Sequence, residues 1–385
     1  MMEQKVPYPE LDTPALLVDM EKLEANIRES SQLAYDAGLK LRPHAKVHLC
    51  ADIAKMQIEA GACGIDVGPL GQAEGMAEEG IKDILIAHPG FYGGPKGEAL
   101  KRLLSKRDVK VTIAVDMVEQ AEYISRIAQE VGRKVFVVLK IDANAPAGGW
   151  SRYGVLPGKP AVDLALAVRQ IKGIELIGIY THEMGGPPSN KYAFKVLSLM
   201  AETARMLEKA GIRVEHVSVG ASNTFRQTCR YVKEGIFPEL TEIHPGSYIM
   251  GCLWYVMTGG NPSEETCAGS MLTTVMSTSH PDWAVIDAGY DALGTSAIEG
   301  KKRWRGMPSF GSIRGRPDLW LGYLCTETGV VYYTDPTKKK LSLGERLQII
   351  PNNMLPIVNA RDQLYGVRNG MVERVIRVTG RGRGH

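Results

Sequence analysis

The sequence predicts an α/β protein that consists of a (β/α)8 barrel and a second, antiparallel β domain. Over the first two thirds of the 385 residues, eight short strands alternate with helix-length segments. The strands are mostly apolar on both faces, as expected of strands buried in a parallel sheet. After about residue 250 the alternation gives way to short strands separated by turn residues. A doubly wound open sheet alternates in the same way, so the barrel is inferred from the number of strands.

The barrel elements follow from two kinds of periodicity. Short apolar runs predict strands at residues 40–46, 64–67, 83–87, 109–115, 134–141, 175–180, 214–219 and 240–243. Apolar residues that return every three or four positions predict helices most clearly at residues 20–36, 72–79, 117–131 and 192–209. Residues 20–250 are therefore predicted to form the barrel.

The rest of the chain is predicted to form the β domain. Its strands are indicated by alternating or β-branched segments at residues 272–277, 283–286, 320–324, 330–333, 346–350, 365–368 and 372–378. Residues 13–19 form an apolar segment that precedes the first helix and has no partner in the barrel. We expect this segment to join the β domain, which would then comprise residues 1–19 and 251–385.

The composition indicates an ordinary globular enzyme. With 44% hydrophobic and 23% charged residues, the chain can bury a core in each domain. A net charge of +3 gives no sign of a nucleic-acid or membrane partner, and no apolar run is long enough to span a bilayer. The six cysteines lack paired metal-type spacing, and we recognise no signal peptide. We expect a cytoplasmic protein that acts on a small molecule.

Polar residues follow the predicted barrel strands at their carboxyl ends, where the active sites of such barrels lie. They are His44, Lys46, His48, Asp66, His88, Asp142, Tyr180, His182, residues 222–224 and His244. A single core histidine is usually structural. Several histidines around one predicted rim indicate a functional site instead.

Two loops rich in small and hydroxyl-bearing residues indicate a bound phosphate. Residues 219–224 follow the seventh strand and residues 245–248 the eighth, which is where barrels commonly hold phosphate. Either loop alone would be an ordinary turn. Together with Lys46 near the end of the first strand they predict pyridoxal 5'-phosphate, with Lys46 as the Schiff-base lysine and a desolvated pocket that lowers its pKa.

The segment at residues 42–48 reads RPHAKVH. It resembles the signature of the fold-type III pyridoxal-phosphate enzymes, which share the alanine racemase fold and include D-threonine aldolase and eukaryotic-type D-serine dehydratase. Further segments with such a resemblance, spread over nearly the whole chain, are residues 12–19, 178–182, 242–248, 287–289, 356–359 and 367–370. The resemblance implies a homodimer, to which Trp254, Tyr255 and Trp304 could contribute apolar contact area.

The resemblance also assigns roles to individual residues. Lys46 would carry the cofactor, with His44 in the pocket wall and Arg152 beside the cofactor ring. Tyr180 would lie near the reacting centre, and His182 is a second candidate for proton transfer there. The phosphate would be held by Gly220, Ser222, Asn223, Gly246, Ser247 and Tyr248.

One segment departs from the family pattern. At residues 351–356 the family carries a histidine and, two positions on, an aspartate or cysteine that bind a divalent metal, whereas this chain has Asn353 and Leu355. Asparagine is a poor ligand for such an ion and leucine is none. We therefore expect no metal at this position, although Asn353 could bind the substrate. The competing interpretation is that His48, His88 or Asp362 recruits an ion elsewhere.

The resemblance favours a lyase that cleaves D-β-hydroxy amino acids, as D-threonine aldolase does. The alternative is a metal-independent amino acid racemase or epimerase, which would need Lys46 on one face of the substrate and Tyr180 or His182 near the other. A third hypothesis is a cofactor-binding protein without catalysis. Nothing in the sequence identifies the side chain of the substrate.

Overall fold

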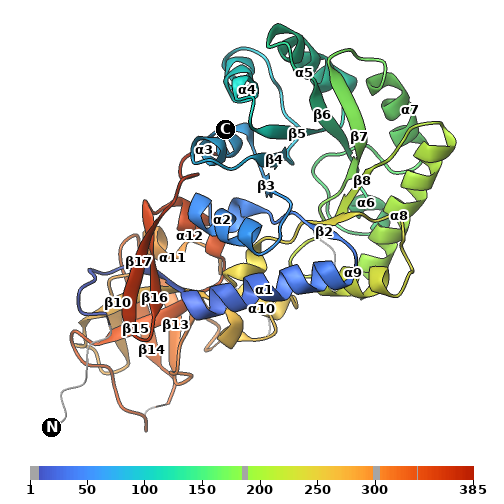
Figure 1. Cartoon of the computed structure of the whole chain (residues 1–385). Coiled ribbons are helices and arrows are strands. Elements are labelled where there is room, and N and C mark those ends of the chain that lie inside the picture. Colours follow the sequence, from blue (N-terminus) through green and yellow to red (C-terminus); the bar gives the residue numbers. More distant parts are fainter. Residues whose placement is uncertain (1–7, 184–189, 298–303, 336) are drawn as a thin grey trace. The chain divides into compact units, whose positions relative to one another are not determined.

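The computed structural model describes residues 8–183, 190–297, 304–335 and 337–385 (Figure 1). The chain divides into two compact units. The barrel unit comprises Ile27–Gly246 and Gly382–His385, and the β unit comprises Met1–Asn26 and Ser247–Arg381. In the described part of the chain, no helix is both long and apolar enough to cross a membrane.

The barrel unit is built on a sheet of eight parallel strands, which confirms the predicted barrel-type fold. The strands follow one another in the order β2-β9-β8-β7-β6-β5-β4-β3. Their bounds are Lys40–Leu41 (β2), Ile65–Val67 (β3), Asp83–Ile86 (β4), Lys110–Val115 (β5), Val135–Lys140 (β6), Ile174–Tyr180 (β7), His216–Val219 (β8) and Glu242–Ile243 (β9). The two ends of the sheet meet where His44 and Asp66 form a parallel bridge and the Asp66 N–H donates to the Pro43 carbonyl at 2.9 Å.

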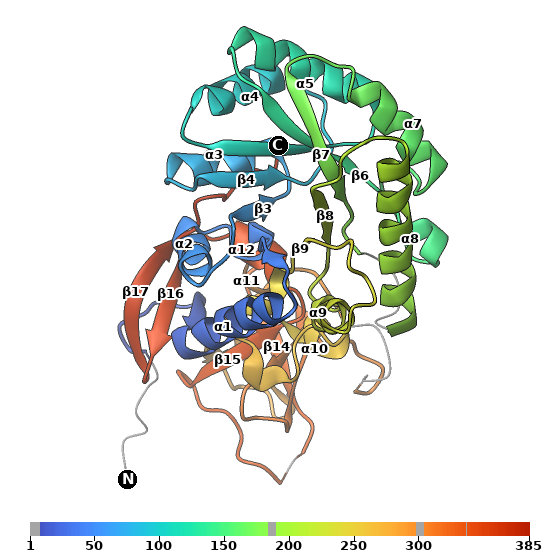
Figure 2. The ribbon, with the colours of Figure 1, turned by 45° about the vertical axis from the view of Figure 1, so that its right-hand side comes forward.

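Helices cover the outer face of this sheet (Figure 2). Those of the barrel unit are α2 (Ala51–Glu59), α3 (Leu70–Glu78), α4 (Pro95–Ser105), α5 (Val118–Glu130), α6 (Asn144–Ala147), α7 (Lys159–Val168), α8 (Asn190–Lys209) and α9 (Phe225–Lys233); α1 (Met20–Asp36) leads into it. Helix α5 illustrates their amphipathic pattern, because its buried residues include Ala121, Ile124 and Ala128, spaced three or four positions apart.

The first barrel strand is shorter than predicted. Strand β2 ends at Leu41, and Lys46 lies on a 3-10 helix, η1 (Ala45–Val47). Pro43 has no N–H to donate to a sheet ladder, which favours an end to regular pairing at this point. The Nδ1 atom of His44 then accepts the Lys46 N–H at 3.4 Å and caps the turn. Lys46 is therefore held by a capped turn after the strand, where residues 40–46 were predicted to run as one strand.

The β unit contains a nine-stranded sheet with the main order β13-β14-β11-β10-β1-β16-β17, while β15 pairs with β10 and β12. The strands are Ala15–Asp19 (β1), Gly269–Ser277 (β10), Trp283–Ile286 (β11), Gly311–Ile313 (β12), Leu319–Leu324 (β13), Gly329–Tyr333 (β14), Arg346–Pro351 (β15), Gln363–Arg368 (β16) and Met371–Arg377 (β17). The short helices are η2 (Ser247–Ile249), α10 (Leu253–Met257), η3 (Glu264–Thr266), α11 (Tyr290–Leu293) and α12 (Met354–Asn359).

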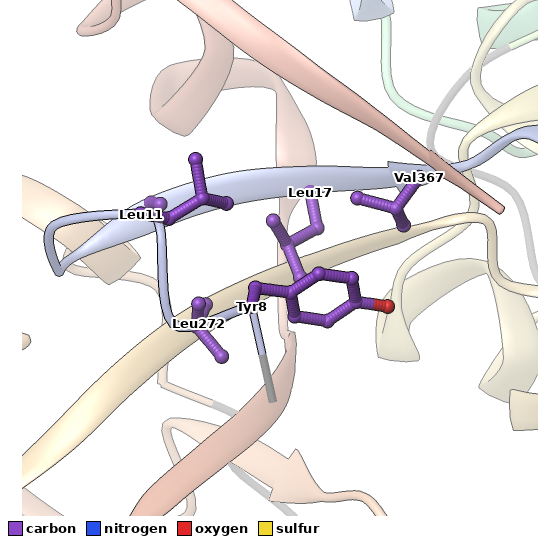
Figure 3. Packing of buried hydrophobic residues seen from close by; sticks show 6 residues of the cluster. Tyr8, Leu11, Leu17, Leu272 and Val367 are labelled. Atoms are coloured by element: carbon purple, nitrogen blue, oxygen red, sulfur yellow. The ribbon is translucent and has the colours of Figure 1, made fainter. Parts of the chain in front are cut away.

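The sheet is antiparallel, as predicted for this domain, except at one pairing. Strand β1 runs antiparallel to β10 but parallel to β16, because the N-terminal segment inserts between two strands from the other end of the chain. Figure 3 shows the apolar cluster around this strand, in which Leu17 and Leu272 are at most 1% exposed and Tyr8 packs beside them. Burial of each leucine stabilises the unit by about 1.5–3 kcal/mol.

A buried ion-pair network links four barrel strands. Arg42 follows β2 and donates through Nε to Glu242 at 2.9 Å and through a terminal nitrogen to Asp83 at 2.6 Å. Glu242 also accepts a hydrogen bond from Ser218 of β8 at 3.0 Å. The Ser218 hydroxyl in turn lies 2.8 Å from His244 Nδ1. The network therefore connects the packing of the barrel to a histidine at its rim.

We predict that Glu242→Ala lowers the free energy of unfolding by about 3–5 kcal/mol, because it leaves the buried Arg42 guanidinium without its main partner. Urea denaturation measures this change. The matched control is Asp108→Ala, which removes a surface ion pair with Lys82 and should cost less than about 1 kcal/mol. A loss of less than about 1 kcal/mol for Glu242→Ala as well would contradict the proposed importance of the network.

Candidate active site

A cavity opens at the carboxyl ends of the barrel strands. The empty space in it, including the part open to solvent, is about 400 Å³. All of its lining residues belong to the barrel unit. They are His44, Lys46, Ala87, His88, Lys140, Ile141, Asn144, Trp150, Ser151, Arg152, Tyr153, Tyr180 and His182.

Lys46 projects from η1 into this cavity. Its Nζ lies 3.3 Å from Nε2 of His182. Burial lowers the pKa of the Lys46 amine to about 8, while the Asp66 carboxylate partly opposes that shift and Arg152 adds to it. A larger fraction of this amine is therefore neutral near pH 7 than for an exposed lysine, and a neutral amine is the nucleophilic form.

Tyr180 is the fully buried residue at the end of β7. Its hydroxyl donates to Oδ2 of Asp66 at 2.6 Å. The His244 ring stacks on the tyrosine with 4.2 Å between centroids, and the Lys140 Nζ lies 4.0 Å from the centre of the tyrosine ring. Burial, followed by the Asp66 carboxylate, raises the pKa of Tyr180 well above its ordinary value. The phenol is therefore protonated at neutral pH and already donates its proton to a partner.

Three imidazoles surround the lysine and the tyrosine, and all three are neutral. Burial and the neighbouring cations lower the pKa of His44, His182 and His244 well below the ordinary value. Within the described ranges, His182 Nδ1, His244 Nε2 and Oδ1 of Asp66 are buried without a hydrogen-bond partner. Buried polar atoms are usually paired, so a bound group that supplies partners would be stabilised here.

Lys140 is a component of the site that the sequence pattern did not single out. It ends β6, is only 5% exposed, and lines the cavity together with Lys46. Burial lowers the pKa of its amine to about 7. The Asp66 carboxylate opposes this shift, and the Lys46 amine adds to it. The available signal was a lysine that closes the apolar run at residues 135–139. Such a residue commonly reaches solvent from a strand end, so its inward position could not be inferred.

Arg152 and Trp150 lie at the open side of the cavity. Both side chains are exposed, and the Arg152 guanidinium lies 5.8 Å from the Trp150 ring centre and 5.1 Å from that of Tyr153. Arg152 lines the cavity, and its predicted place beside a cofactor ring stays a prediction. This wall of the cavity is formed by residues that follow helix α6. Asn144, the first residue of α6, fixes the helix to the site because its side chain donates to the His182 carbonyl at 3.0 Å.

The two loops predicted to hold phosphate approach one another in the barrel unit. The Ser222 hydroxyl accepts the Gly246 N–H at 3.3 Å. A Cβ atom on Gly246 would lie 2.4 Å from the His44 carbonyl oxygen, and one on Gly220 would lie 3.1 Å from the backbone nitrogen of His244. Glycine is therefore required where the two loops approach their neighbours. Asn223 lies between Ser222 and α9 and is half-buried.

The other predicted site residues lie in the β unit. Ser247 and Tyr248 form the start of η2, and their part in phosphate binding stays a prediction. Asn353 is the N-cap of α12, where its side-chain oxygen accepts the Leu355 N–H at 3.1 Å. That bond gives Asn353 a structural role, and its predicted contact with substrate is untested. Across the residues that the structure describes, no cluster of three or more His, Cys, Asp or Glu side chains could hold a metal ion.

Comparison with known proteins places this geometry in a family. Residues 18–253 match the family model of the alanine racemase N-terminal domain, and residues 268–367 match that of a serine dehydratase domain. A 3-hydroxy-D-aspartate aldolase of Paracoccus denitrificans (strain Pd 1222) is 29% identical over 98% of this chain and 94% of its own length. A D-threonine aldolase of Arthrobacter sp is 28% identical over 98% and 94%, respectively.

Solved structures agree with these matches. The crystal structure of D-threonine aldolase from Filomicrobium marinum aligns with a TM-score of 0.84 and 27% sequence identity, covering 99% of this chain and 98% of that one. The predicted resemblance to fold-type III enzymes is thereby confirmed. The chain belongs to the alanine racemase N-terminal domain family, and a domain of the serine dehydratase type follows the barrel in the sequence.

Proposed function

We propose that the protein is a pyridoxal-phosphate enzyme that acts on D-amino acids as a lyase, cleaving D-β-hydroxy amino acids. The observation that carries the proposal is the Lys46 amine, whose pKa burial lowers to about 8 and which faces a cavity containing a neutral histidine at 3.3 Å. The aldolase names of the similar proteins support this reaction class. A cytoplasmic location and a homodimer belong to the same proposal, and Trp254, which is 56% exposed, could lie in the dimer contact.

The residues of the cavity fit the cofactor. Lys46 would form the covalent link, and the adjoining loops that contain Gly220, Ser222 and Gly246 would bind the phosphate group through backbone and hydroxyl donors. The polar atoms without partners on His182, His244 and Asp66 offer contacts to a bound ring. Pyridoxal phosphate, when bound, supplies a sink for the electron pair left at the substrate Cα.

His182 is the better candidate for the base. Its imidazole is neutral because burial lowers its pKa, so it can accept a proton from the substrate β-hydroxyl as the Cα–Cβ bond breaks. The proton that His182 takes up can pass to Lys46, whose Nζ lies 3.3 Å away, and from there to the substrate Cα, so that both side chains regain their starting state. The products are an aldehyde and glycine. Tyr180 is less suited to act as a base, because its phenol is protonated and bonded to Asp66.

Racemisation remains the second candidate. It requires proton donors and acceptors on opposite faces of the substrate carbon. Lys46 and His182 are neighbours at 3.3 Å, so they do not lie on opposite faces of the substrate carbon. The raised pKa of Tyr180 further weakens its role as the opposing base. Both observations favour the lyase over the racemase. A cofactor-binding protein without catalysis is the third candidate, which the reaction panel below tests.

The covalent link should form at Lys46 and not at Lys140, although burial lowers the pKa of both amines. Lys140 lies against the Tyr180 ring, whereas Lys46 projects from the turn beside the phosphate loops. Borohydride reduction of the protein with pyridoxal phosphate, followed by peptide mapping, should label residue 46. The Lys140→Met variant is the matched control and should still be labelled at Lys46. A label on Lys140 in the unmodified protein would refute the assignment.

We predict that the chelated enzyme releases glycine and an aldehyde from D-threonine or a larger D-β-hydroxy amino acid and leaves the L-isomers unchanged. The reason is that Asn353 and Leu355 replace the metal-ligating pair of the family. His182→Gln should lower kcat by at least about 100-fold through loss of the base. Product analysis by chromatography distinguishes cleavage from dehydration, racemisation and no reaction. Activity that disappears on chelation and returns with manganese or zinc would contradict the metal-free mechanism.

A further inference from the structure

Glu183 is a buried acid beside the predicted phosphate loop. It directly follows His182, is 4% exposed, and lies in the barrel unit. Its Oε2 accepts a hydrogen bond from the hydroxyl of Thr224. Its other oxygen, Oε1, is buried and has no hydrogen-bond partner in the described part of the chain. A buried carboxyl group with one unsatisfied oxygen is costly unless it is protonated or meets a donor.

Thr224 connects this acid to the loop. The residue is the N-cap of α9, yet its side chain makes no capping hydrogen bond. A threonine at this position usually accepts an N–H from the first turn of the helix. Here the hydroxyl is directed to Glu183 instead, while the Phe225 N–H in the first turn of α9 donates to the Ala221 carbonyl at 3.0 Å. The positive end of the helix dipole, next to the small residues Gly220 and Ser222, favours an anion.

An ionised Glu183 would oppose that anion. Burial raises the pKa of Glu183 to about 7, whereas the Thr224 hydroxyl and the Gly220 N–H act in the lowering direction. In the described part of the chain, no charged side chain from the packed elements contributes to the shift. The acid is therefore near its midpoint at neutral pH before any ligand arrives. A phosphate dianion beside it favours the protonated form, because like charges repel strongly in a desolvated site.

We propose that Glu183 takes up a proton when a phosphate group binds at residues 220–224, so that phosphate binding at this loop is coupled to protonation. The inference rests on the proposed function, since it assumes that the cofactor phosphate lies at this loop. The proton comes from solvent. The neutral acid can donate to the Thr224 oxygen, and the Thr224 hydroxyl then becomes a donor to the phosphate. Glu183 is thus a positioning residue that acts through Thr224.

The test compares the full-length chain with its Glu183→Gln variant, both freed of bound cofactor. The probe is pyridoxamine 5'-phosphate, which carries the phosphate group but has no aldehyde to react with Lys46. Its Kd is measured by calorimetry from pH 6 to pH 9. Titration of the ligand affects both proteins equally, so the ratio of the two Kd values isolates Glu183.

We expect a ratio near one at pH 6, where both side chains are neutral in the complex. At pH 9 the glutamine variant should bind at least about tenfold more tightly than the wild type. Above the pKa of Glu183, binding to the wild type requires the uptake of one proton, which weakens that binding by up to tenfold per pH unit. Pyridoxine, which lacks the phosphate, should show no such trend. A ratio that does not change with pH, or the same trend with pyridoxine, overturns the proposal.

Thr224→Val provides a second, independent variant. It should weaken pyridoxamine 5'-phosphate binding at pH 6 while leaving pyridoxine binding unchanged, since the hydroxyl would then be a phosphate donor. Equal effects on both ligands would show a purely structural role and overturn the proposed action of Glu183. Failure of this inference is distinguishable from failure of the proposed function, because borohydride labelling of Lys46 could succeed while the Kd ratio stays constant.

Discussion

The carboxylate of Asp66 is the group on which the site depends most. The backbone of Asp66 joins the two ends of the barrel sheet through the bridge with His44 and the hydrogen bond to Pro43. Its side chain accepts the Tyr180 hydroxyl at 2.6 Å. It is also the anion that raises the pKa of both Lys46 and Lys140 against the opposing effect of burial. One residue thus contributes to barrel closure, to the position of the tyrosine and to the charge of two amines.

Sharing one carboxylate between two lysines has a chemical consequence. Burial raises the pKa of Asp66 itself to about 7, close to the values near 7 and 8 of the two amines. The three groups interact closely enough to exchange protons with one another. The cavity can therefore hold a neutral amine and neutral imidazoles at the same pH. Such a site suits a reaction in which protons move over short distances between fixed groups.

Much of this architecture could be predicted because the signals are local. Helix α1 has the predicted bounds of residues 20–36, and β11 those of residues 283–286, since hydrophobic periodicity reports on the immediate environment. The barrel followed from the number of apolar strands. Lys46 was identified because the surrounding segment at residues 42–48 resembles a family signature.

The remaining features depend on contacts between distant residues. Strand β1 lies parallel to β16, about 350 positions further along the chain, and no local pattern specifies such a pairing. Lys140, at the end of β6, and Glu183, three positions after β7, were missed because charged residues at such positions usually reach solvent, and their burial follows only from tertiary packing. The bond between Tyr180 and Asp66 likewise follows from tertiary packing, and no local pattern in the sequence indicates it.

The pKa of the Lys46 amine tests the central claim most directly. It can be measured from the rate at which pyridoxal phosphate links to the cofactor-free protein, followed by absorbance across a range of pH. Because burial lowers this pKa from 10.5 to about 8, the rate should rise with a midpoint near pH 8. Asp66→Asn should move the midpoint lower, since the variant removes the carboxylate that raises the pKa. A midpoint near 10.5, or one that Asp66→Asn leaves unchanged, would contradict the account.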